Sequence, residues 1–475
     1  MLLKAEKLQK EYGIQEIFDI DRIVVEDGAR IGLVGRNGTG KSTLLSVLCG
    51  RIPADEGTVN RYCEIAEIRQ DALAEGESEQ QYISRMGLRG SAVESGGEKM
   101  RLAIAAAFSM HAPLLFADEP TTNLDLNGVL LLEKMLTGYR GGMILVSHDR
   151  MLLDNVCNQI WELENGKLRI FDGNYSAWAD QKEQEREYRQ FEYEQYQKER
   201  QRLTQAVSEI ETEAKNMKKP PRKMGHSEWM LYKGIASQQQ RNVSNRGSAI
   251  KSRLSHLEQK EKPVELPKVS MIGMHLTRMK AKYAAKVENL TVEFDGHPVL
   301  EQANLMVESG KKTFLTGENG TGKSTLLRAL VQRRPGTFFT EDAQISYFSQ
   351  ELLELQKGKT VLENVLYGAA EPEHICRAVL ANLYISKNDL NKKLEVLSGG
   401  ERVKTALAKV LVSGCNFMIL DEPTNHMDIY TMEGLEKMLA GYEGTLLAVS
   451  HDRRLVEKLA DVVYEMKKGK CLRIK

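Results

Sequence analysis

The sequence predicts an α/β protein in which two copies of one domain are joined by a long antiparallel α-helical hairpin. Three observations indicate this architecture. Whole segments recur at fixed spacings along the 475 residues. Each copy alternates short apolar runs with amphipathic stretches, and the segment between the copies carries heptad-spaced apolar residues in a highly charged background. We expect the first domain at residues 1–180, the linker at 181–280 and the second domain at 281–475.

Length and composition limit the possible classes of protein. A chain of 475 residues is too long for one core, and 41% hydrophobic with 28% charged residues is typical of a soluble globular protein. No apolar run approaches the roughly 20 residues that cross a bilayer, and the N-terminal stretch lacks the apolar region of a signal peptide. We therefore expect a cytoplasmic protein with no membrane partner. The six cysteines are scattered without a C-x-x-C pair, which argues against a zinc site, an iron–sulfur cluster or a disulfide framework.

The repeat is explicit in the sequence. GLVGRNGTGKSTLL from Gly32 recurs as FLTGENGTGKSTLL from Phe314, at a spacing of 282. The SGGE, DEP and SHDR segments recur at a spacing of 303, whereas Gln70 and Gln350 are 280 apart. Because 303 − 280 is 23, the first copy is 23 residues shorter than the second between its glutamine and its SGGE segment. The apolar runs RIGLV, LLFA and MILV, and KTFLT, FMIL and TLLAV, are typical of buried strands in a mostly parallel sheet.

Each copy carries G-x-x-x-x-G-K-[ST] between an apolar run and a helical stretch, which predicts a phosphate-binding loop of the P-loop type. Glycines let the backbone close around phosphates, and the N–H groups that open the helix face the negative charge. Lys41 and Lys323 should reach the β- and γ-phosphates, and Ser42 and Ser324 should bind Mg²⁺. The loop residues expected to bind ATP are Gly35, Asn37, Gly38, Gly40, Lys41, Ser42 and Thr43, with Gly317, Asn319, Gly320, Gly322, Lys323, Ser324 and Thr325.

Two acids follow an apolar strand in LLFADE and again in FMILDE. Asp118 and Asp421 are expected to hold the metal, directly or through water. Glu119 and Glu422 can polarise the attacking water as general bases. Solvated acids that merely cap a strand would not require four apolar residues before them.

Further polar residues recur in register. His148 and His451, in S-H-D after another strand, are placed to contact the γ-phosphate, and Gln70 and Gln350 are expected to bind the metal and water.

Two aromatic residues also recur. Tyr12 and Phe294 precede the first glycine of their loops by the same interval and suit stacking on adenine, with a core aromatic as the alternative.

The SGGE segments each open a helix and offer backbone N–H groups to an anion. They comprise Ser95, Gly96, Gly97 and Glu98, and Ser398, Gly399, Gly400 and Glu401. With the phosphate loop, glutamine, D-E pair and histidine in this order, both copies resemble the ATP-binding cassette superfamily over essentially their whole length. The first copy departs from the usual L-S-G-G-E by having Glu94 in the leading position, which puts the packing of that helix in doubt.

The resemblance implies that each SGGE segment completes the site of the other copy, in a head-to-tail sandwich within one monomer. One composite site would join Lys41, Ser42, Glu119 and His148 with Ser398 and Gly400. The other would join Lys323, Ser324, Glu422 and His451 with Ser95 and Gly97. Both glutamates are present, so both sites are expected to hydrolyse ATP.

The linker carries two apolar stripes at heptad spacing, which predict two long helices packed as an antiparallel hairpin, the first from Gln181 to Met217. The alternative is a solvated charged spacer. The stripes comprise Tyr193, Tyr196, Leu203, Val207, Ile210, Ala214 and Met217, and then Val243, Ile250, Leu254 and Leu257. Between them we expect a basic, proline-broken tip loop at about 214–242.

The tip is expected to contact RNA. Residues 214–257 contain ten Lys and Arg against one acid, an electrostatic footprint for phosphate. Its aromatic and Met side chains could stack on unpaired bases or a tRNA end, or close a small core of their own. The expected contacts are Lys215, Lys218, Lys219, Arg222, Lys223, Trp229, Met230, Tyr232, Lys233, Arg241 and Arg246.

Two fused cassettes, a helical hairpin and no membrane segment resemble the ABC-F family of translation factors. The shortened part of the first copy is where transporter subunits dock their membrane partners. KMGHSEWMLYK resembles the K-M-x-x-S-E-x-x-L-x-K pattern of the antibiotic-resistance ribosomal protection branch (Vga/Lsa/VmlR-like).

That resemblance implies binding at the ribosomal exit site in the ATP state, with the tip directed toward the peptidyl-transferase centre, large-subunit rRNA and the P-site tRNA. It further implies protection from pleuromutilin, lincosamide and streptogramin A drugs. A housekeeping ABC-F factor and a soluble ATPase subunit of a transporter remain as alternatives.

Overall fold

The computed structural model describes residues 1–13, 15–69, 79–86, 96–216, 226–257, 260, 277–294, 297–352, 354–425 and 427–475. The chain divides into two compact units. One is formed by Met1–Trp178 together with Leu266–Lys475 and contains both copies of the repeat; the other is Ala179–Glu265.

The first copy is built on a six-stranded sheet with strand order β5-β6-β7-β3-β8-β9, parallel except for the β8–β9 pair. A second, antiparallel sheet has the order β2-β1-β4. Strands β6 and β7 are buried along their whole length, as expected for strands covered on both faces. The strands are β1 (Leu3–Tyr12), β2 (Gln15–Val25), β3 (Arg30–Val34), β4 (Glu56–Arg61), β5 (Ile65–Ile68), β6 (Leu114–Asp118), β7 (Gly142–Val146), β8 (Gln159–Glu164) and β9 (Lys167–Asp172). The helices are α1 (Lys41–Cys49), α2 (Gln80–Arg85), α3 (Gly96–Ser109), α4 (Leu126–Thr137) and α5 (Arg150–Val156).

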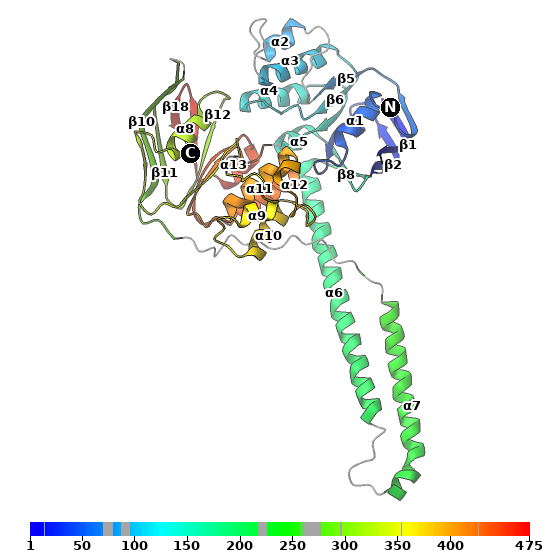
Figure 1. Cartoon of the computed structure of the whole chain (residues 1–475). Helices are drawn as coiled ribbons and strands as arrows, with labels where there is room; N and C mark the ends of the chain where they lie inside the picture. Colours follow the sequence, from blue (N-terminus) through cyan, green and yellow to red (C-terminus); the bar gives the residue numbers. More distant parts are fainter. Residues whose placement is uncertain are drawn as a thin grey trace. The chain divides into compact units, whose positions relative to one another are not determined.

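The second copy repeats this topology strand for strand. Its central sheet has the order β14-β15-β16-β12-β17-β18 and its antiparallel sheet the order β11-β10-β13 (Figure 1). The strands are β10 (Tyr283–Phe294), β11 (His297–Glu308), β12 (Lys312–Gly317), β13 (Thr337–Phe339), β14 (Ile345–Phe348), β15 (Phe417–Asp421), β16 (Thr445–Val449), β17 (Val462–Lys467) and β18 (Lys470–Arg473). The helices are α8 (Lys323–Val331), α9 (Val361–Leu366), α10 (Glu373–Asn382), the 3₁₀ helix η1 (Leu394–Val396), α11 (Gly399–Leu411), α12 (Ile429–Ala440) and α13 (Arg453–Leu459). The predicted fold class, two α/β P-loop domains with a helical linker, is confirmed.

The core of each copy fixes where its phosphate loop begins. In the first copy, Phe18 on the antiparallel sheet, Leu44 on α1, and Phe116 and Trp161 on the central sheet belong to one buried cluster. Each such side chain contributes about 1.5–3 kcal/mol through burial. Because α1 is held on its apolar face between the two sheets, its first turn is fixed at the end of β3. An equivalent cluster fixes α8 at the end of β12.

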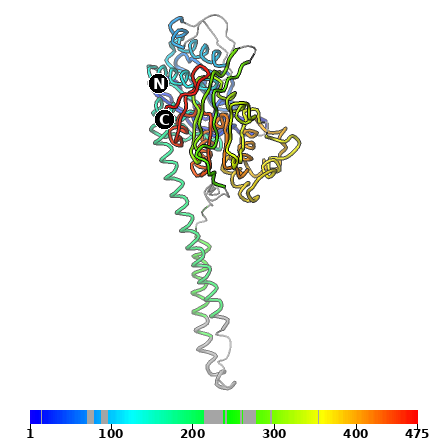
Figure 2. Tube along the Cα trace, turned by 90° about the vertical axis from the view of Figure 1, so that its left-hand side faces the viewer, coloured from blue at the N-terminus to red at the C-terminus, as the bar shows by residue number. Residues whose placement is uncertain are grey.

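The linker unit is a helical hairpin. Helices α6 (Tyr175–Asn216) and α7 (His226–His256) lie side by side in Figures 1 and 2. Glu199 pairs with Arg253 and Glu211 with Lys251, which brings the C-terminal half of α6 against the C-terminal half of α7. The helices run antiparallel, because the earlier residue of α6, Glu199, pairs with the later residue of α7, Arg253. At 42 residues, α6 is about 63 Å long.

The predicted apolar stripes face inward in the described part of the hairpin. Leu203 is 4% exposed and Val243 8% exposed. A Cβ added at Gly247 would lie 3.1 Å from Ile210 Cγ2, so the helices approach closely there. Ala214 is described as part of α6 without its side chain, and Met217 lies outside the described residues.

Both helix starts differ from the sequence expectation. The first helix was expected from Gln181 but begins at Tyr175, because Asn174 and Asp154 cap it: Ser176 N donates to Asp154 Oδ1 at 2.7 Å and Ala177 N to Asn174 Oδ1 at 3.1 Å. The tip was expected to be a loop over about 214–242, but α7 already begins at His226. Residues 229–233 are therefore helical.

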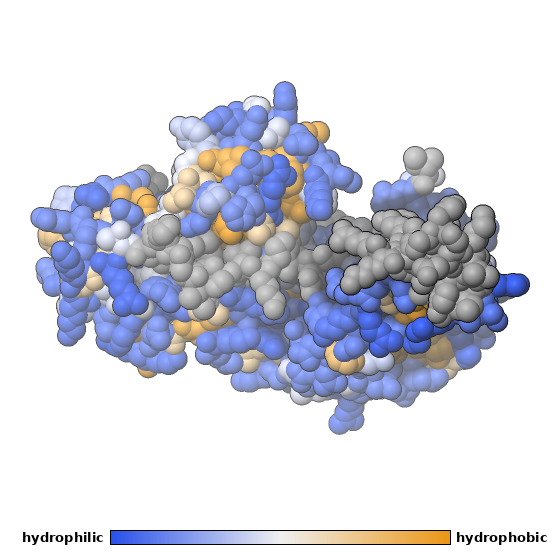
Figure 3. All heavy atoms as spheres, turned by 90° about the horizontal axis from the view of Figure 1, so that it is seen from below, coloured by the Kyte–Doolittle hydropathy of each residue, from blue (hydrophilic) through white to orange (hydrophobic). Residues whose placement is uncertain are grey.

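The visible face in Figure 3 is predominantly hydrophilic, with apolar side chains gathered in smaller patches. Within the described ranges, no helix is long and apolar enough to cross a membrane.

Candidate functional site

The two phosphate loops lie at the carboxyl ends of β3 and β12, the edge where parallel α/β sheets bind ligands. Lys41 Nζ lies 2.9 Å from both Gly35 O and Arg36 O. Lys323 Nζ lies 2.9 Å from Gly317 O and 2.8 Å from Glu318 O. Both ammonium groups are thus folded into their own loops, where phosphate oxygens could replace these carbonyls.

Glycine is required at the residue that opens each of the two helices. Gly40 and Gly322 cap α1 and α8 with φ of 95° and 97°, a left-handed conformation that L side chains rarely adopt. A Cβ at Gly40 would also come within 2.3 Å of Ile17 Cγ2. The loops therefore present backbone N–H groups, rather than side chains, at the start of each helix.

The expected metal ligands come together in the second copy. Ser324 Oγ donates to Asp421 Oδ1 at 3.0 Å. Asp421 Oδ2 is buried and, within the described residues, has no hydrogen-bond partner. A buried carboxylate oxygen of this kind needs a partner, and a hydroxyl beside a carboxylate is the donor set that Mg²⁺ takes in nucleotide sites, so these residues fit the metal.

The remaining metal candidates are less fully described. In the first copy Asp118 is buried at the end of β6, and Ser42 is exposed in the first turn of α1. Gln350 is exposed in a turn after β14, and Gln70 lies outside the described residues.

The glutamate and histidine of each copy meet in the same geometry. His148 Nε2 lies 3.2 Å from Glu119 Oε1, and His451 Nε2 lies 3.2 Å from Glu422 Oε1. Glu119 and Glu422 have left-handed backbones, with φ of 48° and 51°. This conformation costs about 1 kcal/mol or more in a non-glycine residue and concentrates at functional sites.

Burial shifts the pKa values of the two glutamates and the two histidines. It raises the pKa of Glu119 to about 8, against the attraction of Lys41, and that of Glu422 to about 7. Burial and then the nearby lysine lower the pKa of His148 to about 3 and that of His451 to about 4. The glutamates therefore titrate near neutral pH while both imidazoles stay neutral, the condition that suits a general base beside a hydrogen-bonding histidine.

The second SGGE segment opens a helix as predicted. Ser398 Oγ accepts from Glu401 N at 3.3 Å and Glu401 Oε2 accepts from Ser398 N at 2.8 Å, a capping box at the start of α11. Gly399 is exposed and Gly400 half-buried. In the first copy, Gly96, Gly97 and Glu98 form the first turn of α3, while Ser95 lies outside the described residues.

The expected adenine-stacking residues end their strands. Tyr12 at the end of β1 is 51% exposed, with Lys10 Nζ 5.6 Å from its ring centroid, so its ring is accessible and does not belong to a core. Phe294 ends β10, and its side chain lies outside the described part of the structure.

The expected RNA contacts fall mostly outside the described side chains. Arg241 and Arg246 are exposed on α7. Lys215 belongs to α6, and Trp229, Met230, Tyr232 and Lys233 to α7, with side chains that are not described. Lys218, Lys219, Arg222 and Lys223 lie outside the described residues.

Each phosphate loop touches the other copy. Asn37 N lies 3.4 Å from Asp428 Oδ2, and Asn319 Nδ2 donates to Asn123 O at 3.2 Å. Asn123 and Asp428 follow the D-E pairs at the ends of β6 and β15, so each loop meets the segment after the D-E pair of the opposite copy.

Sequence reasoning missed the aspartates of these segments. Asp125 and Asp428 cap α4 and α12 and take a basic partner from their own SGGE helix: Arg101 Nη2 lies 2.7 Å from Asp125 Oδ1, and Lys404 Nζ 3.5 Å from Asp428 Oδ2. Although burial opposes ionisation, Lys404 and the N–H groups of the helix start lower the pKa of Asp428. The signal was present, because DEPTTNLD and DEPTNHMD both end in this aspartate.

The arginines of the two SHDR segments were also missed. Arg150 reaches the other copy, with Nη1 2.7 Å from Glu436 Oε2 and Nη2 3.0 Å from Asp452 Oδ2. Arg453 reaches back in the same way, with Nη2 2.7 Å from Glu133 Oε2. These reciprocal ion pairs join the two copies directly beside His148 and His451.

Arg150 and Arg453 differ in burial, so their replacement should lower the stability of the protein by different amounts. The Arg150 side chain is 2% exposed and its partner Glu436 5%, whereas Arg453 is 13% exposed. We expect Arg150→Gln to destabilise the protein by about 3 kcal/mol, because it removes a buried guanidinium that pairs with both Glu436 and Asp452 and leaves Glu436 with the exposed Lys458 alone. Arg453→Gln should cost less. Thermal unfolding of both variants checks this, and a larger loss in Arg453→Gln would contradict it.

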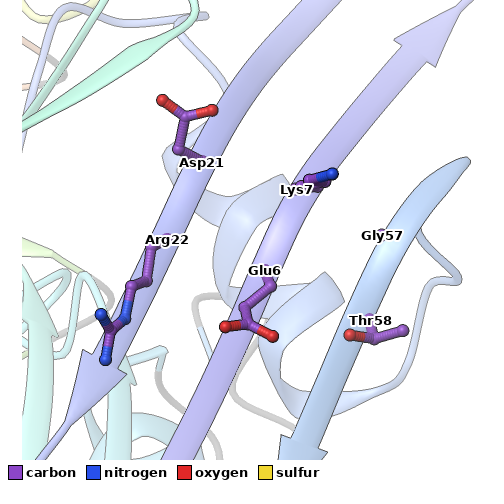
Figure 4. Close-up of a pocket in the computed structure, with 6 residues that line it drawn as sticks. All are labelled: Glu6, Lys7, Asp21, Arg22, Gly57 and Thr58. Carbon is purple, nitrogen blue, oxygen red and sulfur yellow. The ribbon is translucent and has the colours of Figure 1, made fainter.

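A separate depression lies on the antiparallel sheet of the first copy (Figure 4). Its lining comes from β1, β2 and β4 and comprises Glu6, Lys7, Asp21, Arg22, Gly57 and Thr58. It is open, carries charges of both signs and contains none of the predicted site residues, so we assign it no part in the site.

The chain is similar to known proteins over most of its length. Two family models, both described as ABC transporter, match residues 20–88 with 300–425, and residues 161–230. The chain is 33% identical to the erythromycin resistance ATP-binding protein MsrA of Staphylococcus epidermidis, over 94% of each chain. It is 32% identical to the ribosome protection protein VmlR of Bacillus subtilis, over 94% of this chain and 83% of that protein.

A solved structure shares the fold. An archaeal ribosome recycling factor, in complex with a ribosomal stalk protein, aligns with a TM-score of 0.66 at 18% identity, over 98% of this chain and 90% of that one.

Proposed function

The chain belongs to the ABC-F family of tandem ATP-binding cassette proteins, and we propose from this premise that it is an ATPase that protects the ribosome from antibiotics. In the ATP state it would bind the ribosomal exit site and direct the segment between α6 and α7 toward the peptidyl-transferase centre. The drugs concerned are of the pleuromutilin, lincosamide and streptogramin A type.

The residues of each copy can perform ATP hydrolysis. Lys41 and Lys323 would exchange their loop carbonyls for phosphate oxygens, beside the N–H groups that open α1 and α8. Ser324 and Asp421 would hold Mg²⁺ in the second copy, with Ser42 and Asp118 at the corresponding positions of the first. Once bound, the metal would neutralise charge on the phosphates.

Glu119 and Glu422 would accept the proton of the attacking water. Each glutamate accepts a hydrogen bond from the histidine of its own copy. The backbone N–H groups of His148 and His451 donate to Glu119 Oε2 and Glu422 Oε2, both at 3.3 Å. Each imidazole lies 3.2 Å from the other oxygen of the same carboxylate, and that oxygen has no hydrogen-bond partner among the described residues. A neutral imidazole carries one N–H, which could be donated to a phosphate oxygen.

We propose two composite ATP sites. The first would join Lys41, Glu119 and His148 with Ser398 and Gly400, and the second Lys323, Glu422 and His451 with Ser95 and Gly97. The contacts from Asn37 to Asp428 and from Asn319 to Asn123 support this pairing, since each loop already touches the opposite copy.

The ribosomal role is carried by one observation: a 42-residue helix leads to a segment with ten Lys and Arg and one acid between residues 214 and 257. Such a localised basic segment on a long hairpin suits contact with RNA phosphates. Two relatives named for erythromycin resistance and ribosome protection support the same role.

The raised pKa values of the two glutamates predict the same pH dependence at both sites. A general base must be ionised, so kcat/KM should rise with pH and level off above the pKa of the base in the free enzyme. Burial raises the pKa of Glu119 to about 8 and that of Glu422 to about 7, so in Glu422→Gln and in Glu119→Gln alike the midpoint should lie near or above pH 7. The histidines stay neutral and add no midpoint above pH 5. ATPase assays from pH 5 to 9 check this, and a rate that has already reached its plateau at pH 6 in either variant would contradict it.

A housekeeping ABC-F factor and an ATPase subunit of a transporter are the competing functions. Lysate from cells expressing the tagged protein should be separated into ribosomes and membranes after incubation with ATP or without nucleotide. We expect ATP-dependent recovery with ribosomes. Recovery with membranes in place of ribosomes would contradict the proposal, and ribosome binding without drug protection would favour the housekeeping role.

A further inference from the structure

The first phosphate loop contacts aromatic rings of the second copy. The Arg36 guanidinium lies 4.6 Å from the ring centroid of Tyr384 and 6.0 Å from that of Tyr430. The same residue supplies one of the carbonyls that hold Lys41 Nζ, at 2.9 Å. A change in the position of Lys41 therefore acts directly on the residue that carries this cation–π contact, an interaction worth about 0.5–2 kcal/mol.

The rings continue from Tyr430 to the start of the linker helix. Tyr430 lies 6.1 Å from Trp178 in an edge-to-face arrangement, and Trp178 lies 5.3 Å from Tyr175, the first residue of α6. Tyr175 and Trp178 are 0% and 2% exposed. These four rings, those of Tyr384, Tyr430, Trp178 and Tyr175, form one cluster, called here the root cluster.

Hydrogen bonds anchor the root cluster to both copies. Tyr430 OH donates to Glu162 Oε1 on β8 at 2.8 Å, and Tyr175 OH donates to Glu433 Oε1 on α12 at 2.7 Å. Buried aromatic side chains with satisfied hydroxyls have little freedom to shift one at a time. A displacement of α12 relative to β8 would therefore move Tyr175 and with it the first turn of α6.

The second phosphate loop is built differently at the same positions. The counterpart of Arg36 is Glu318, at the spacing of 282 that relates the two loops, and the counterpart of Tyr430 is Asn127, at the spacing of 303 that relates the segments after the D-E pairs. These two also meet, Asn127 Nδ2 lying 2.6 Å from Glu318 Oε1. A carboxylate–amide hydrogen bond thus stands where the first loop has a cation–π contact, and neither residue carries a ring that could join a cluster.

We infer that Arg36 is a positioning residue that couples ATP binding at the first site, and not at the second, to the start of the linker helix. When Lys41 binds phosphate, it gives up its hydrogen bond to the Arg36 carbonyl, and Arg36 can shift. The Arg36 guanidinium then moves against the ring of Tyr430, and Tyr430 moves Trp178 and Tyr175. The inference rests on the proposed ATP-dependent action of the hairpin, but it concerns only the coupling within the cassette unit.

Hydrogen–deuterium exchange of the full-length protein tests the inference. Peptides that cover residues 174–185 should be compared without nucleotide and with Mg²⁺ and a non-hydrolysable ATP analogue. Nucleotide should slow their exchange by about fivefold in the wild type, the lower end of typical coupling between sites. Arg36→Ala should abolish this protection, while the matched change at the second loop, Glu318→Ala, should leave it in place.

Further variants assign the effect to a site. Lys41→Ala should abolish the protection and Lys323→Ala should preserve it. Tyr430→Phe keeps the ring and should also preserve it. Nucleotide binding is measured in the same samples with a fluorescent ATP analogue. Arg36→Ala is expected to bind at the first site within about threefold of the wild type, because the change keeps the backbone of the loop and removes a guanidinium that lies against Tyr384 and Tyr430.

Several outcomes would overturn the coupling. These are absence of protection in the wild type, persistence of protection in Arg36→Ala, equal loss in Arg36→Ala and Glu318→Ala, and loss of nucleotide binding at the first site in Arg36→Ala. The last result would make Arg36 part of the ATP site and not a link from it. None of these readouts uses ribosomes, so a failure of ribosome binding would refute the proposed function without altering this result.

Discussion

Replacing both proposed general bases, Glu119→Gln and Glu422→Gln, is expected to slow ATP turnover by 100-fold or more and to retain the protein on ribosomes. Loss of a general base typically costs about 10²–10⁴ in rate. Glutamine keeps the size and the hydrogen-bonding oxygen of the side chain, so it should still accept from the N–H groups of His148 and His451. ATP would bind and bring the copies together without being consumed. Sedimentation of purified ribosomes through a sucrose cushion measures the retained fraction.

The controls separate trapping from non-specific association. Lys41→Ala with Lys323→Ala removes the ammonium groups of both loops and should leave the protein in the supernatant with or without ATP. Each single glutamine variant should fall between the wild type and the double variant. If the double variant pellets no better than the wild type in ATP, hydrolysis does not control release from the ribosome.

Removing residues 219–232 and bridging the gap with Gly-Ser is expected to abolish drug protection. The deletion takes away the segment after α6 and the first two turns of α7, but it keeps the pairs that hold the hairpin, Glu211 with Lys251 and Glu199 with Arg253. The protein should therefore fold, and ATP-dependent ribosome binding should weaken only in part. Translation in vitro with a pleuromutilin or a lincosamide measures protection.

A charge variant provides the matched control for the deletion. Changing Lys218, Lys219, Arg222 and Lys223 to Gln keeps the length of the segment and should lower the log–log salt slope of ribosome binding by about one unit for each phosphate that the lysines and arginines no longer neutralise. A deletion variant that still rescues translation would show that the segment is not the effector.

The local motifs allowed much of the fold and of each half-site to be predicted, because their chemistry depends on residues close together in sequence. A phosphate loop needs its glycines and lysine within eight positions, and the capping box at Ser398 and Glu401 spans four. The D-E and S-H-D segments were each predicted to follow a strand, and the structure adds that these strands, β6 and β7, are parallel neighbours, which brings Glu119 beside His148.

The contacts between the copies could not be predicted in this way. Arg150 and Glu436 are 286 positions apart, and their pairing depends on how two separately folded sheets meet. Only the recurrence of the arginine in both SHDR segments indicated that it had a role. The early start of α6 likewise depends on Asp154, a cap supplied by α5, which helical periodicity does not reveal. The tip was predicted as a loop over about 214–242 from its basic residues and its Pro220-Pro221 pair, so the start of α7 at His226 was missed.

The minimum inhibitory concentration against large-subunit drugs, with and without the gene, tests the central claim most directly. Expression of the wild-type protein should raise it several-fold for pleuromutilins, lincosamides and streptogramin A compounds, and leave it unchanged for a drug that acts on the small subunit. The Lys41→Ala, Lys323→Ala protein, matched for expression by immunoblot, should give no increase. An unchanged inhibitory concentration for every large-subunit drug, in cells whose ribosomes carry the wild-type protein, would contradict ribosome protection.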